Sequence, residues 1–168
     1  QWEGGYGIAD VDALSSDAAV GEIAVAQYVP VPVDGRLVPT MVVHPVRGSI
    51  APTITEGRAP TGMEEVALGA ATLEASGTAV GERVLVEAED GPVEMLVTGV
   101  VVFPALGLND TERPNLGTGV LAERPFVEQT PGLATALVRL RPGVDRDEAI
   151  SHLRATYEQS AADARVLT

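Results

Sequence analysis

Short Val-rich runs, separated by turn residues, dominate the pattern of apolar and polar positions along this chain. They predict strands at residues 21–33, 37–44, 65–68, 83–88, 93–103, 119–122, 134–140 and 165–168. Asp34-Gly35 and Asp90-Gly91 predict tight hairpin turns between neighbouring strands. The segments 45–63 and 104–118 are rich in Gly and Pro and are expected to be connections.

Proline positions refine the first predicted hairpin. Pro30, Pro32 and Pro39 cannot donate ladder hydrogen bonds, so we expect this hairpin to be an edge or irregular pair rather than a sheet centre. Gly99, in the middle of the run 93–103, suggests a bulge or a bend.

Helical signals are fewer. A short helix is predicted over 69–76, ended by Gly77, and another over 124–129. Asp145 is expected to cap a helix that runs to about residue 160. On that helix the positions i, i+3 and i+7 form one apolar stripe that should pack onto the sheet, namely Ile150, Leu153 and Tyr157. Residues 1–18 are expected to be an extended or partly helical lead-in.

Strands with a few interspersed helices indicate an α+β fold. Hairpins outnumber any βαβ series, so we expect a mostly antiparallel or mixed sheet with a few short helices and one C-terminal amphipathic helix. The length of 168 residues fits a single domain over residues 1–168, and a smaller β-rich subdomain over about 64–120 is an alternative division.

Composition and charge exclude several classes of function. Apolar residues make up 45% of the chain and aromatic residues only 4%, so the core must be mainly aliphatic. The formal net charge is −13 and every basic residue is Arg, which leaves no basic footprint for nucleic acid. The absence of Lys beside abundant Ala, Val, Gly and Arg is typical of a high-GC bacterial genome. There is no Cys, so disulfides and thiolate chemistry are excluded.

The remaining candidate chemistry is sparse. His44 and His152 are far apart in the sequence, and a histidine zinc site needs three or four convergent ligands, so both are expected to be surface or half-buried residues. Acidic pairs such as Glu64-Glu65 are expected by chance among 24 acidic residues, and Glu87 to Gly91 has the composition of a solvated hairpin tip. We therefore expect no enzymatic activity, and no catalytic, cofactor-binding or metal-binding residue.

An ordered set of motifs lies between residues 56 and 101. Glu56-Gly57-Arg58 with Pro60 is followed by Glu65 to Gly69, then by residues 77–84 with Val80-Gly81-Glu82, and then by Val97 to Val101. Gly57 and Gly69 are expected to supply turns around a short buried strand. We interpret these residues as makers of the fold, not as a site.

This set resembles the extracytoplasmic domain of FtsX-like, MacB-like ABC transporter permeases, over about residues 55–140. Glu82 stands where that family more often has Asp. The resemblance implies a non-catalytic domain outside the bacterial cell membrane, flanked by transmembrane helices of the same chain and served by a cytoplasmic ATPase subunit. It implies a part in transmitting ATP-driven motion or gating export. A second permease copy or an extracellular partner could contact it.

Two expectations follow from that resemblance. The chain should be a piece of a longer protein whose two termini lie at one end of the fold, with the loop 104–118 pointing away from the membrane.

The alternative is a secreted or cell-wall-associated module that binds a small ligand or peptide, which would need an apolar pocket with a few polar groups. The Pro-rich hairpin, at which a strand could be added, motivates this alternative.

Overall fold

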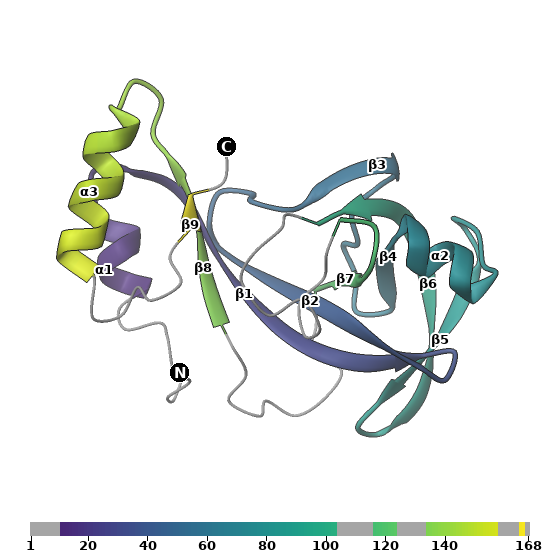
Figure 1. Ribbon diagram of the computed structural model, residues 1–168. Coiled ribbons are helices and arrows are strands. Elements are labelled where there is room, and N and C mark those ends of the chain that lie inside the picture. Colours follow the sequence, from purple (N-terminus) through teal and green to yellow (C-terminus); the bar gives the residue numbers. More distant parts are fainter. Residues whose placement is uncertain (1–10, 104–115, 124–133, 158–164, 167–168) are drawn as a thin grey trace. The chain divides into compact units, whose positions relative to one another are not determined.

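The structure is a computed structural model that describes residues 11–103, 116–123, 134–157 and 165–166. Its elements, in chain order, are α1 (Val11–Ser16), β1 (Val20–Val33), β2 (Arg36–Arg47), β3 (Thr53–Gly57), β4 (Glu65–Gly69), α2 (Ala70–Ser76), β5 (Arg83–Ala88), β6 (Gly91–Val102), β7 (Val120–Ala122), β8 (Ala134–Leu140), α3 (Arg146–Tyr157) and β9 (Arg165–Val166). Figure 1 shows these elements coloured along the sequence. The mixed sheet with short helices confirms the α+β prediction.

The chain divides into two compact units. One comprises residues 1–27, 44–51 and 131–168, and the other comprises residues 28–43 and 52–130. The strands β1 and β2 contribute residues to both units. The prediction of one extracytoplasmic domain over residues 1–168 stays a prediction.

In the second unit, six strands are joined into a closed ring. β2 pairs with β1 and with β7, β7 pairs with β4, β4 with β6, β6 with β5, and β5 with β1. The β2–β7 and β4–β6 pairs are parallel, whereas β4–β7, β5–β6 and β1–β5 are antiparallel. Ring closure leaves few strand edges open to a second chain.

The ring encloses an aliphatic core, as the composition predicts. Alternate residues of all six strands meet in one cluster, made of Val31, Val33, Val38, Val66, Leu68, Val84, Val86, Met95, Val97, Val120 and Ala122. β4 is buried along nearly its whole length, because it lies between β6 and β7. Helix α2 follows it directly and contacts β4 and β6. Gly77 ends α2 in the left-handed conformation, with φ of 67°, as predicted.

In the first unit, two helices pack against β1 and β8, which belong to the same mixed sheet as the ring strands. β8 pairs antiparallel with residues 20–27 of β1 and parallel with β9. Leu14 of α1 and Leu153 of α3 share one apolar cluster with residues of β1 and β8, and Figure 1 shows the two helices beside each other. The burial of Leu153 confirms its place in the predicted stripe. Ile150 is half-buried, while Ala149, which the stripe did not include, is buried.

Arg47 at the end of β2 ties this unit together. Its guanidinium donates hydrogen bonds to the carbonyl oxygens of Ser15, Val20 (2.5 Å) and Gly21 (3.1 Å). Arg141 adds a hydrogen bond from Nε to the carbonyl of Val20 at 3.0 Å. Charge-assisted hydrogen bonds of this kind are stronger than neutral ones. They satisfy carbonyls at the end of α1 and at the start of β1.

Two local expectations need correction. The segment 45–63 is not only a connection, because it holds β3, which pairs antiparallel with β6; the β-branched run Thr53 to Thr55 outweighs the surrounding Gly and Pro. The Pro-rich hairpin is not at a sheet edge, since β1 pairs with β2, β5 and β8, but it is an irregular pair, the other predicted alternative, because the pairing of β1 with β8 and β5 is interrupted between Gln27 and Val33. Pro30 and Pro32 are tolerated because they lie between two paired parts of β1. Gln27 pairs with Ala134 of β8, and Val33 pairs with Val86 of β5.

Other expectations concern parts of the chain outside the described residues. The predicted helix over 124–129, the loop over 104–115 and both termini lie there, so the expected placement of the termini and of the loop stays a prediction. Tyr157 is the last residue of α3, but the structure does not describe its side chain, so its place in the stripe stays a prediction. In the described part of the chain, no helix has the length and apolar character needed to cross a membrane.

Candidate functional site

The charged residues of the motif form an ion pair that closes the loop between β3 and β4. Arg58 donates two hydrogen bonds to Glu65, from Nη1 to Oε2 at 2.7 Å and from Nη2 to Oε1 at 2.5 Å. The backbone N–H of Thr61 also donates to Oε2, at 2.9 Å. Arginine suits this geometry because its planar guanidinium matches a carboxylate in a two-point contact. Arg58 is largely exposed, so the pair acts as a clamp at the surface of this loop.

A close backbone approach explains the glycine that precedes this clamp. Gly57 has φ of 69°, and a Cβ there would stand 2.3 Å from the carbonyl oxygen of Thr98 on β6. Facing it on β6, Gly99 marks the predicted irregularity, since the pairing with β4 shifts register between Val97 and Gly99. The glycines therefore allow β3 and β6 to approach, which supports the interpretation that these motif residues make the fold.

The clamp predicts a specific dependence of stability on pH. The hydrogen bonds from Arg58, with that from the Thr61 backbone, lower the pKa of Glu65 from 4.5 to about 2. Because the folded state holds this carboxylate charged, its contribution is full above about pH 4.5 and is lost as pH falls towards 2. We expect Glu65→Gln to lower Tm above that window and to lose its effect within it, as measured by circular dichroism melts from about pH 6 to about pH 2.

The matched control is Glu64→Gln, which removes the exposed neighbouring carboxylate but leaves the clamp in place. The other acidic residues titrate in the same way in both variants, so their effect on Tm cancels when the two are compared. If the Tm difference between wild type and Glu65→Gln stayed constant from about pH 6 to about pH 2, the clamp would have no part in acid stability.

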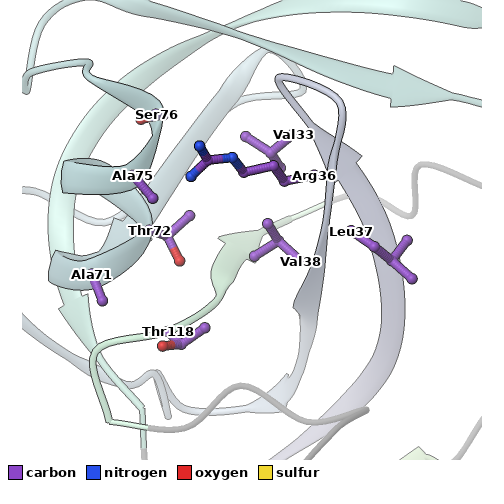
Figure 2. Close-up of a pocket in the computed structure, with 9 residues that line it drawn as sticks. All are labelled: Val33, Arg36, Leu37, Val38, Ala71, Thr72, Ala75, Ser76 and Thr118. Atoms are coloured by element: carbon purple, nitrogen blue, oxygen red, sulfur yellow. The ribbon is translucent and has the colours of Figure 1, made fainter.

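The second unit also carries a small pocket between α2 and the β1–β2 hairpin. Its volume is about 170 Å³. Its walls come from three separate segments, with residues Val33, Arg36, Leu37, Val38, Ala71, Thr72, Ala75, Ser76 and Thr118. Figure 2 shows Val38 and Thr72 facing each other across the pocket, between the hairpin and the helix. The lining is mainly apolar, with hydroxyl groups from α2 and from Thr118.

Arg36 gives this pocket its only positive charge among the lining residues. In Figure 2 its guanidinium reaches from the hairpin towards Ala75 and Ser76 of α2. The side chain is exposed, and within the described residues no acidic side chain or carbonyl is found in hydrogen-bond contact with it. The pocket therefore combines an aliphatic floor with one cation that is open to a ligand.

Local hydrogen bonds hold the pocket in shape. The Asp34-Gly35 turn that precedes Arg36 has φ of 47° and 74°, and the Asp34 N–H donates to the carbonyl of Leu85 at 2.9 Å. On the other side, Thr72 accepts a hydrogen bond from the N–H of Gly119 at 2.9 Å, which fixes the 117–119 segment against α2. The turn was predicted from the sequence, but the pocket was not.

In the described residues, the two histidines and the acidic clusters do not converge on one site. His152 lies on the surface of α3 and contacts Asp17, with Nε2 2.9 Å from Oδ2. His44 is half-buried, and burial lowers its pKa. Both observations agree with the prediction of surface or half-buried histidines. Among the residues that the structure describes, no group of three or more His, Asp and Glu side chains is arranged to hold a metal ion.

Comparisons with known proteins identify a similar fold but no family. No family model matches the chain, and no curated protein matches it significantly. The structure is similar to the crystal structure of a domain of a proposed permease protein from Porphyromonas gingivalis, with a TM-score of 0.50 and 14% sequence identity. The similarity covers 94% of this chain and 79% of that chain. At this identity it shows a shared fold.

Proposed function

We propose that this chain is an extracytoplasmic domain of an ABC transporter permease of the FtsX-like, MacB-like kind. In this role it has no enzymatic activity and stands on the outer face of a bacterial cell membrane. It transmits motion from transmembrane helices that a cytoplasmic ATPase drives, or it gates the path of an exported substrate. Its partners are those helices, the ATPase through them, and a second permease copy or an extracellular protein.

The agreement between motif and fold carries this proposal. The ordered motif at residues 56–101 resembles one permease family, and the fold as a whole resembles a domain of another proposed permease. In the structure, the motif residues Gly57, Arg58 and Glu65 all serve the joint between β3, β4 and β6. A motif that specifies this joint is a marker of the fold, so both observations point to the same class of domain.

The absence of Cys from the chain makes a direct test of location simple. In the full-length parent protein, with any cysteines elsewhere replaced, Leu37→Cys places one thiol at a side chain that is 69% exposed. We expect a membrane-impermeant maleimide to label this thiol on intact cells. Met95→Cys is the matched control, because Met95 is fully buried and its thiol should react only after unfolding.

Two results would contradict the proposal. One is labelling of Leu37→Cys only after lysis, and the other is a parent gene without a transmembrane segment on each side of this chain. With the ATPase partner present, the labelling rate should also differ between the active ATPase and a variant that cannot hydrolyse ATP. An unchanged rate would remove the motion-coupling part of the proposal and leave the location intact.

The second candidate is a secreted or cell-wall-associated module that binds a ligand or peptide. The pocket beside Arg36 favours it, because an apolar pocket with few polar groups is the expected form of such a site. Labelling alone does not separate the two candidates, because a cell-wall-associated module is also accessible to the maleimide, so cell fractionation is the deciding measurement. A module of this kind would be recovered from the medium or the cell-wall fraction, with no membrane-bound parent.

A further inference from the structure

We propose that the pocket between α2 and the β1–β2 hairpin binds the C-terminus of a peptide that ends in an aliphatic residue. The last side chain occupies the pocket, and the terminal carboxylate pairs with Arg36. This inference goes beyond the proposed permease role and does not depend on it.

The size and lining of the pocket select the apolar part of the ligand. A dry apolar cavity of about 150 Å³ accommodates a group of roughly six carbons. The pocket has a volume of about 170 Å³, with the buried residues Val33 and Val38 on one side and the exposed residues Ala71 and Ala75 on the other, so it is an open hollow rather than a closed cavity. A Leu, Ile or Val side chain fits this volume, whereas a long acyl chain would extend beyond it.

Charge complementarity selects the anionic part. Arg36 is the cation of the pocket, and its guanidinium extends from the hairpin towards Ala75 and Ser76 of α2 (Figure 2). A guanidinium binds a carboxylate in a two-point contact. The net charge of −13 disfavours a doubly charged phosphate held by a single arginine. The hydroxyl of Thr118 lies on the same lining and is suited to a carboxylate oxygen, whereas Ser76 already donates its hydroxyl to the carbonyl of Leu73 at 2.9 Å.

The close spacing of cation and apolar floor indicates a chain terminus. Arg36 and Val38 stand two residues apart on one strand face, so the bound anion must lie next to the bound apolar group. In a C-terminal residue, carboxylate and side chain are attached to the same Cα. The described lining holds no Asp or Glu to receive a free α-ammonium group. An acylated residue, as in a peptide, therefore fits better than a free amino acid.

The experiment is a titration of the isotope-labelled 168-residue chain, followed by NMR. The probes are acetyl-Ala-Ala-Leu with a free carboxylate, the same peptide with a C-terminal amide, and free leucine. We expect the free acid to shift the amide signals of Ala71, Thr72, Ala75 and Thr118 and to bind with a Kd near the millimolar range. The amide and free leucine should each bind about tenfold more weakly.

Two variants test the roles of charge and volume. Arg36→Gln should weaken the free acid about tenfold and abolish the difference between acid and amide. Arg154→Gln, at an exposed position of α3 in the other unit, is the matched control and should change neither. Ala75→Leu should fill the pocket and abolish binding of all probes, whereas Ala70→Leu, on the same helix but outside the lining, should bind as the wild type does. The unliganded spectrum of each variant shows whether it is folded.

Several outcomes would overturn the inference. Equal affinity of wild type for the acid and the amide would remove the role of Arg36. Free leucine binding as tightly as the acetylated peptide would rule out a peptide terminus. Signal shifts confined to residues outside the lining, or no shifts at millimolar peptide, would show that the pocket does not bind this ligand.

Discussion

Leu68→Ala is expected to lower the free energy of unfolding by about 2–5 kcal/mol. Leu68 lies on β4, where it is paired with Val100 of β6 and Val120 of β7, and its side chain is fully buried. The substitution removes apolar atoms from the centre of the closed ring and leaves a cavity that strands on both sides cannot easily fill. Domains of this size have only about 5–15 kcal/mol of stability, so the loss is a large share of it.

Urea denaturation followed by circular dichroism measures this loss. Leu37→Ala is the matched control, because it removes the same atoms from a side chain that is 69% exposed. Surface changes of that kind usually stay within about 0.5 kcal/mol. If the two variants differed by less than about 1 kcal/mol, the ring interior would be far more adaptable than its packing indicates.

Elements with local signals were the ones that the sequence predicted. Asp34-Gly35 specifies a turn through residues that tolerate positive φ, and the structure has this turn. Asp145 was expected to cap the last helix, and its Oδ1 accepts a hydrogen bond from the N–H of Glu148 at 2.9 Å. The strand over 83–88 was predicted at its observed bounds. Each of these signals acts within a few residues, so no knowledge of the partner strand is required.

Contacts between distant segments could not be predicted in the same way. The parallel pairing of β2 with β7 joins Thr40 to Val120, and no residue in either strand specifies that neighbour. This pairing helps to close the ring and brings Thr118 to the pocket beside Arg36. Strand β3 was missed for a related reason: its β-branched run is short and lies among Gly and Pro residues, and the partner β6 that it pairs with is distant in the sequence.

The clamp between Arg58 and Glu65 shows how much of the candidate site the sequence could predict. Both residues belong to the recognised motif, and seven positions separate them. Their pairing depends on the path of the intervening loop, including the Thr61 N–H that donates to Glu65. A motif gives the residues that must be present, but the contact between them requires the conformation of the loop.

The sequence correctly indicated that Gly69 matters to the fold, but the expected reason was wrong. The sequence suggested that it supplies a turn after the buried strand, yet its φ of −64° and ψ of 148° are extended values open to any residue. What requires glycine is space: a Cβ at this position would lie 2.3 Å from the carbonyl oxygen and 2.5 Å from the carbonyl carbon of Gly117. Because those atoms belong to the backbone, a side-chain rotation cannot relieve the contact.

We therefore expect Gly69→Ala to lower the free energy of unfolding by about 2–4 kcal/mol, from overpacking and from weakened hydrogen bonds. Residues 117–119 must move away from α2. That movement strains the bonds from the N–H of Gly69 to Gly119 (2.9 Å) and from the N–H of Ala71 to Gly117 (2.8 Å). Urea denaturation gives the energy, and NMR should show the largest changes at Thr72 and Gly119.

Gly77→Ala is the informative comparison for this prediction. Gly77 has φ of 67°, but a Cβ there would meet no atom within 4 Å, so the change costs only the left-handed backbone penalty of about 1–2 kcal/mol. The two glycines thus separate crowding from conformation within one helix, at its two ends. A loss at Gly69 no larger than that at Gly77, with unchanged signals at Gly119, would mean that the 117–119 segment yields freely and that the close approach does not stabilise the start of α2.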